Sequence, residues 1–201
     1  CGTTLAVFRF WSKGAVDLKV ALIAAVSSFI GSGIAAKIVL MIDDHILKMM
    51  LLLILPCVTM VISLKRSFGE EDLSSRLSDQ ATIILPLIIG FLIGGYDGLF
   101  GPGTGTFAII AFSILMKYDL KTASGNAKIL NLASNYASLI TFALAGTVIY
   151  KIAIPAAICN IIGNYLGSGC ALTKGAKFIR PMMTAVLTLL LGKILIDIFI
   201  K

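Results

Sequence analysis

A glycine-rich stretch from Asp97 to Thr106 interrupts a long apolar run and carries groups suited to binding a ligand. Glycine and proline disfavour a helix interior, so the stretch predicts a break between two helical segments. A helix starting just after the break would aim unpaired N–H groups and its positive dipole end at an anion. We therefore predict that an anion binds at Gly101, Pro102, Gly103, Thr104, Gly105 and Thr106. The alternative is that the glycines only let helices pack closely.

Asp97 is the carboxylate that lies deepest within an apolar run of this sequence. An acidic group inside a membrane is a candidate for carrying a proton. It could equally cap free N–H groups at the break. We predict proton coupling as its role and keep capping as the alternative.

A second polar cluster begins at Asn126 and continues through Lys128, Asn131 and Asn135. On a helix the last three fall at positions i, i+3 and i+7, which places them on one face. A cation followed by two amides suits an oxyanion, so we predict that all four residues bind substrate. The alternative is that Lys128 is an anchor whose charge reaches the membrane interface.

The sequence lacks the common catalytic and metal-binding motifs of enzymes. The four cysteines form no C-x-x-C pair, and the single histidine, His45, stands in a predicted loop. These features argue against a zinc site, a disulfide framework and a catalytic histidine pair. We expect no catalytic residue, no metal and no cofactor. Gly163 and Gly167 form a G-x-x-x-G pattern, which we interpret as a helix-packing motif.

The composition predicts a membrane protein with several crossings. Of the 201 residues 58% are hydrophobic and only 13% are charged, whereas soluble domains are close to half apolar and a quarter charged. The net charge of +7 comes from basic residues spread over many short segments. Such a spread is typical of membrane-protein loops, not of nucleic-acid binding. Apolar runs long enough to span a bilayer cover residues 20–36, 46–64, 129–150, 152–172 and 181–200, and residues 1–11 complete a further span.

The run 81–116 is too long for one helix, and charge counting favours a hairpin that enters and leaves on one side. With a hairpin, twelve of the seventeen Lys and Arg residues fall on one face of the membrane; with a single crossing the two faces are nearly equal. The basic face is expected to be cytoplasmic, which places the C-terminus outside.

An internal repeat divides the chain. The segment Ile30-Gly31-Ser32-Gly33 matches Leu166-Gly167-Ser168-Gly169, and Lys13-Gly14 aligns with Ala145-Gly146. We predict that residues 1–64 are the C-terminal part of a first repeat, 65–80 a cytoplasmic linker and 81–201 a complete second repeat. The repeat predicts roughly 50 residues of the first unit before Cys1. Each unit has an odd number of crossings, so the fold is predicted to be an all-α bundle of two inverted repeats, each with a glycine-broken hairpin.

Three stretches of the chain resemble the sulfite exporter TauE/SafE family of permeases, namely residues 94–107, 123–135 and 163–181. The resemblance covers the whole chain, apart from the family's first glycine-rich motif. It implies about eight transmembrane segments and transport of sulfite, sulfonates or related anions. Carried over by motif, it points to Asp97, the 101–105 glycine segment and the four polar residues of the second cluster.

The expected function is therefore secondary transport of a small anion across the bacterial cytoplasmic (inner) membrane, with proton-coupled export by alternating access. An anion channel is the main alternative, because a broken helix can also line a pore. An integral-membrane enzyme is less favoured. The expected partners are the anionic substrate and the lipid bilayer, not nucleic acid, and homo-oligomerisation is left open.

Overall fold

The computed structural model describes residues 2–43, 45–47, 49–50 and 69–199, and it is helical with short connections throughout these parts. Most of the predicted span 46–64 lies outside the described residues. The elements in chain order are α1 (Gly2–Ser12), α2 (Leu18–Val39), the 3-10 helix η1 (Ser74–Arg76), α4 (Ala81–Leu99), α5 (Thr104–Ile114), α6 (Leu120–Leu144), α7 (Tyr150–Lys174) and α8 (Ala176–Phe199).

Three of the described helices, α2, α4 and α7, are long and apolar enough to cross a membrane. They expose large apolar side chains, among them Val26 on α2, Leu92 on α4 and Ile154 on α7. A soluble protein would pay a hydrophobic penalty for such a surface, whereas lipid solvates it. The prediction of a multi-span helical membrane protein is confirmed.

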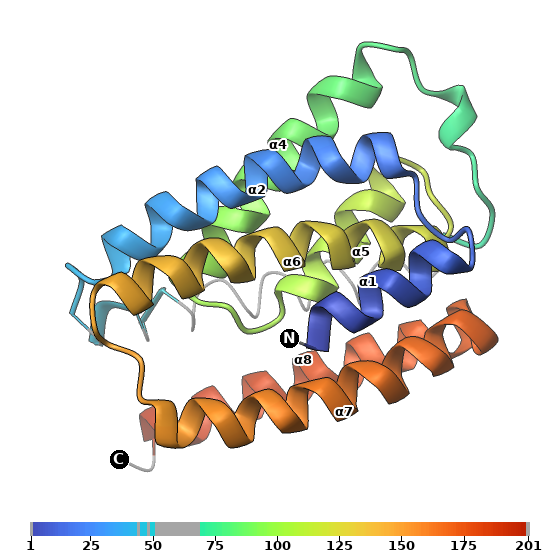
Figure 1. The fold of residues 1–201 in the computed structure, drawn as a ribbon. Coiled ribbons are helices and arrows are strands. Elements are labelled where there is room, and N and C mark those ends of the chain that lie inside the picture. Colours follow the sequence, from blue (N-terminus) through green and yellow to red (C-terminus); the bar gives the residue numbers. More distant parts are fainter. Residues whose placement is uncertain (1, 44, 48, 51–68, 200–201) are drawn as a thin grey trace.

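The helices α4 and α5 form the predicted hairpin. They meet at the turn 100–103, and their outer ends lie at the same end of the bundle (Figure 1). Two backbone hydrogen bonds join the segment before α4 to the segment after α5: Leu73 N–H donates to Lys117 O at 2.9 Å, and Leu120 N–H donates to Gly69 O at 3.0 Å. The helical hairpin itself is therefore present, and the prediction that it enters and leaves on one side of the membrane stays a prediction.

The two arms of the hairpin are unequal, whereas the sequence suggested two half-helices. α4 has 19 residues and α5 has 11, and 11 residues at 1.5 Å each reach only about half of a 30 Å hydrocarbon core. α4 stays helical through its glycines because α2 packs directly on them. A Cβ on Gly94 would lie 2.4 Å from Ser28 O, and one on Gly98 would lie 2.4 Å from Ser32 O.

The connections at the basic end of the bundle are tied together by polar contacts. Asp17 caps α2 by accepting a hydrogen bond from Val20 N–H, and its other carboxylate oxygen accepts one from the Tyr118 hydroxyl at 2.6 Å. Arg180 and Glu70 form a salt bridge of 3.1 Å. Lys13, Arg76, Lys117 and Lys174, one from each of the four basic segments that the predicted topology places on one face, lie in or beside these connections.

The polar helix α6 begins and ends earlier than the predicted span 129–150. It starts at Leu120 because the Asp119 carboxylate caps the N–H groups of Lys121 and Thr122. It ends at Leu144 because Gly146 takes a left-handed conformation, with φ of 69°. The hydropathy pattern missed the first turns of this helix because they carry the polar residues of the second cluster.

The turns after α1 and α6 have the same geometry at the positions that the repeat aligns. Gly14 and Gly146 have φ of 62° and 69°. Ala15 N–H donates to Phe10 O, and Thr147 N–H donates to Phe142 O in the same way. In Figure 1, α1 and α6 run in opposite directions, and so do α2 and α7. The inverted relation of two whole repeats, and the domain boundaries drawn from it, stay predictions.

Candidate anion-binding site

A cavity of about 330 Å³ lies among α5, α6, α7 and α8, with Phe10 of α1 at its edge. Its volume is near the lower end of the range for small-molecule sites. Among its lining residues are four that the sequence singled out as ligands: Gly105, Thr106, Lys128 and Asn131.

The N-terminus of α5 supplies one wall. Gly101 and Gly103 have φ of 80° and 85°, and these left-handed conformations start the helix at Thr104 immediately after the turn. The Thr104 hydroxyl donates to Gly101 O at 2.7 Å. The N–H groups of Gly105 and Thr106 donate to no acceptor in the part of the chain that the structure describes. The unpaired donors and positive dipole end of α5 thus adjoin the cavity.

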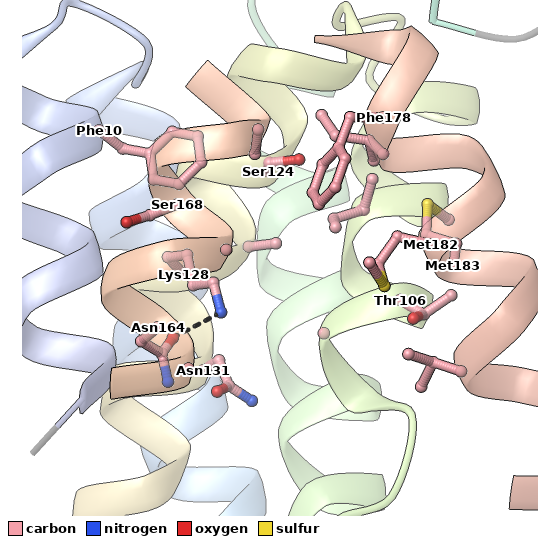
Figure 2. Close-up of a pocket in the computed structure, with 18 residues that line it drawn as sticks. Phe10, Thr106, Ser124, Lys128, Asn131, Asn164, Ser168, Phe178, Met182 and Met183 are labelled. Atoms are coloured by element: carbon pink, nitrogen blue, oxygen red, sulfur yellow. Dashed lines mark hydrogen bonds between the residues drawn. The ribbon is translucent and has the colours of Figure 1, made fainter. Parts of the chain in front are cut away.

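Lys128 supplies the charge. Its Nζ donates to Asn164 Oδ1 of α7 at 3.0 Å, and Figure 2 shows this pair within the cavity. Lys128 stands eight residues after the start of α6, about 12 Å along the helix axis. The amine therefore turns inward to α7 instead of extending to the end of the helix, which favours a ligand role over interfacial anchoring.

Asn164 is a lining residue that sequence reasoning missed. Its amide nitrogen donates to Asn160 O at 2.9 Å, one turn earlier on α7. This bond orients its carbonyl oxygen toward Lys128. The available signal was a pair of asparagines four residues apart in an otherwise apolar span. Contact with Lys128 depends on how α6 and α7 pack, which no sequence spacing gives.

Asn131 and Asn135 continue the polar face of α6. Asn131 lines the cavity. Asn135 lies beyond it, and its amide nitrogen donates to Asn131 Oδ1 at 3.1 Å and to Thr3 Oγ1 at 3.2 Å. Asn135 therefore contacts the cavity only through Asn131. Asn126 faces elsewhere: its carbonyl oxygen accepts a hydrogen bond from Asp17 N–H at 2.9 Å, and it holds the loop before α2.

The hairpin tip forms a separate polar group. The Asp97 carboxylate accepts a hydrogen bond from the Ser134 hydroxyl of α6, and the Thr104 side chain also interacts with it. No described backbone N–H at the break donates to Asp97, so the capping interpretation has no hydrogen bond to support it. Asp97, Gly101, Pro102, Gly103 and Thr104 are absent from the cavity wall. The structure thus splits the predicted ligands between the cavity and the tip.

The wall contributed by α7 includes Gly163 and Gly167. A Cβ added to either glycine would meet no described atom within 4 Å. The interpretation of this G-x-x-x-G pattern as a packing motif is therefore wrong in the described part of the chain. The two glycines leave space instead of bringing helices together.

Arg9 is a second cation near the cavity. Its guanidinium donates to Tyr165 O and, at 3.2 Å, to the hydroxyl of Ser168, which lines the cavity. It also lies over the Tyr165 ring, 4.5 Å from the centroid. Arg9 ties α1 to α7 behind the cavity wall.

No group of three or more His, Cys, Asp and Glu side chains that could hold a metal occurs among the described residues.

Comparison with known proteins gives a single family. Residues 1–194 match the family described as sulfite exporter TauE/SafE. A probable membrane transporter protein of Haemophilus influenzae is 31% identical over 196 residues, which are 98% of this chain and 76% of that protein. The probable membrane transporter protein YfcA of Escherichia coli is 32% identical over 198 residues, 98% of this chain and 72% of that protein. The search of solved structures gave no significant match.

Proposed function

Because the chain belongs to the sulfite exporter TauE/SafE family of membrane transporters, we propose that it is a secondary transporter that moves a small anion, such as sulfite or a sulfonate, across the bacterial cytoplasmic membrane. One observation carries the anion assignment. The amine of Lys128 and the N-terminus of α5 adjoin the same cavity, with the amides of Asn131 and Asn164 beside them.

The electrostatics of this cavity favour a negative ligand. The hydrogen-bond partner of Lys128 is the neutral amide of Asn164, so its charge is not balanced by a described carboxylate. A charged group inside a membrane is costly unless it is paired. An anion would supply the missing charge and would accept hydrogen bonds from the free N–H groups of α5.

Proton coupling is assigned to Asp97. Its carboxylate joins α4, at the hairpin tip, to Ser134 of α6. Protonation would remove the charge that holds this contact and would release the tip from α6. The same tip leads directly into the N-terminus of α5, so its displacement would reach the anion site. This linkage supports export that is driven by the proton gradient and proceeds by alternating access.

The test is anion flux in proteoliposomes of the full-length protein. Sulfite, sulfoacetate, taurine and thiosulfate are offered with and without a pH gradient. Saturable flux that follows the gradient is expected for at least one of them. Unsaturable flux independent of pH would replace the carrier with a channel, and the absence of flux for every anion would overturn the proposal.

A further inference from the structure

The cavity has two chemically different sides. Lys128, Asn131 and Asn164 lie together on one side, and α8 presents Phe178 and Met182 on the other (Figure 2). Met183 and Val186 of α8 extend the apolar side. An inorganic oxyanion bound beside Lys128 would leave these apolar side chains of α8 without a counterpart.

The glycines of α7 keep space free between these two sides. A Cβ on Gly163 or Gly167 meets nothing within 4 Å, whereas one on Gly90 of α4 would lie 2.1 Å from the Ser27 hydroxyl oxygen. Glycine within a helix costs about 1 kcal/mol relative to alanine. Gly90, Gly94 and Gly98 of α4 are required by helix contact, but nothing described requires the two glycines of α7. The absence of side chains at Gly163 and Gly167 leaves free volume in the cavity.

We propose that the site selects an organic anion with a short apolar substituent. The acidic group binds at Lys128 and the N-terminus of α5. The substituent passes over Gly163 and Gly167 and contacts Phe178 and Met182. Methionine is flexible and polarizable, so this wall adapts to more than one substituent shape. The inference rests on the proposed anion site and adds the residues that determine specificity.

The test is a homologous series of alkylsulfonates, from methanesulfonate to butanesulfonate, with sulfite as the member that has no substituent. Affinity of the purified full-length protein is measured for each, and flux is measured in proteoliposomes. Burying one methylene contributes about fourfold in affinity. We expect affinity to rise by about this factor per methylene until the cavity is filled.

Two variants locate the substituent. Gly167→Leu should lower affinity for propanesulfonate and butanesulfonate at least tenfold more than it lowers affinity for sulfite. Gly163→Ala adds only a methyl group and should shift the optimum of the series to a shorter chain. Gly33→Leu is the control, because Gly33 lies on α2 away from the cavity and a Cβ there has its nearest neighbour at 4.0 Å.

The outcomes separate the two proposals. Sulfite binding with a flat alkylsulfonate series would overturn the specificity inference and leave the anion site in place. Equal loss of affinity for all anions in Gly167→Leu, in a variant that elutes and melts like the wild type, would also overturn it. Failure of every anion to bind the wild type would overturn the anion site itself.

Discussion

Lys128 and Asp97 are two ionisable side chains that join helices within the apolar part of the bundle. Lys128 connects α6 to α7 through Asn164, and Asp97 connects α4 to α6 through Ser134. A charged side chain at the centre of a membrane helix costs about 2.5–3.5 kcal/mol on insertion scales. The fold retains two such side chains, and each has a neutral hydrogen-bond partner. Ligand binding by Lys128 and proton binding by Asp97 explain this better than a contribution to fold stability.

At Asp97 the expected effect is on coupling. Asp97→Asn keeps an oxygen that accepts from Ser134, but it cannot exchange a proton. We expect unchanged anion affinity and flux that no longer responds to a pH gradient, measured in proteoliposomes with the gradient set in either direction. Full stimulation by the gradient in this variant would remove Asp97 from the coupling mechanism.

Tyr118 gives a pH dependence outside the membrane span. Burial, together with its hydrogen bond to Asp17, raises the pKa of Tyr118 above its ordinary value. The folded protein therefore favours the protonated phenol, whereas in the unfolded chain tyrosine ionises near pH 10. The contribution of the protonated Tyr118 phenol to the unfolding free energy is therefore fully present below about pH 10 and declines as the pH rises further.

Replacing Tyr118 by Phe should remove a hydrogen bond to a charged acceptor, a loss of about 1.5–3 kcal/mol in unfolding free energy at pH 7. Above about pH 10 the unfolding free energy of the variant should also decline less than that of the wild type, because the variant has no phenol to ionise at this position. Thermal unfolding in detergent between pH 7 and 11 measures both effects. Tyr136→Phe is the matched control, because Tyr136 is exposed on α6. Equal stability of Tyr118→Phe and wild type would contradict this account.

At the scale of elements, the glycine face of α4 fixes the hairpin against α2. Gly94 and Gly95 are adjacent, but only Gly94 faces α2 closely: a Cβ there lies 2.4 Å from Ser28 O, against 3.9 Å from Gly31 O for Gly95. Gly94→Ala should therefore destabilise the fold by about 1–3 kcal/mol through overpacking. Gly95→Ala should be neutral or slightly stabilising. Equal melting temperatures for the two variants would refute the close contact.

The sequence predicted the hairpin but not its proportions or all of the site. Glycine and proline at 101–103 identify the break, and the distribution of Lys and Arg identifies its topology. Retaining Gly94 and Gly98 within α4 depends on a neighbouring helix, so local propensity could not give it. Asp119, a residue type that commonly caps helices, marked the start of α6 in the sequence. The hydropathy pattern did not show this start because the first turns of the helix carry polar residues. Asn164 required knowledge of helix packing.

At the scale of the whole molecule, the hairpin makes a labelling prediction. Single cysteines replacing Ser75 and Lys117, in a cysteine-free background, lie in connections at the same end of the bundle, and one replacing Thr147 lies in a connection at the other. The basic end is expected to face the cytoplasm. A membrane-impermeant maleimide should label Thr147→Cys in intact cells, and the other two only after permeabilisation. Labelling of Ser75→Cys and Lys117→Cys from opposite sides would refute the hairpin.

The most direct test of the anion site is equilibrium binding of a transported anion to Lys128→Gln. The variant keeps a polar side chain that can reach Asn164 but removes the charge. The matched control is Lys121→Gln, in the first turn of the same helix and outside the cavity. Losing a charge-assisted hydrogen bond of about 1.5–3 kcal/mol predicts an affinity at least tenfold weaker for Lys128→Gln, with Lys121→Gln unchanged. Wild-type affinity in Lys128→Gln would contradict the placement of the anion in this cavity.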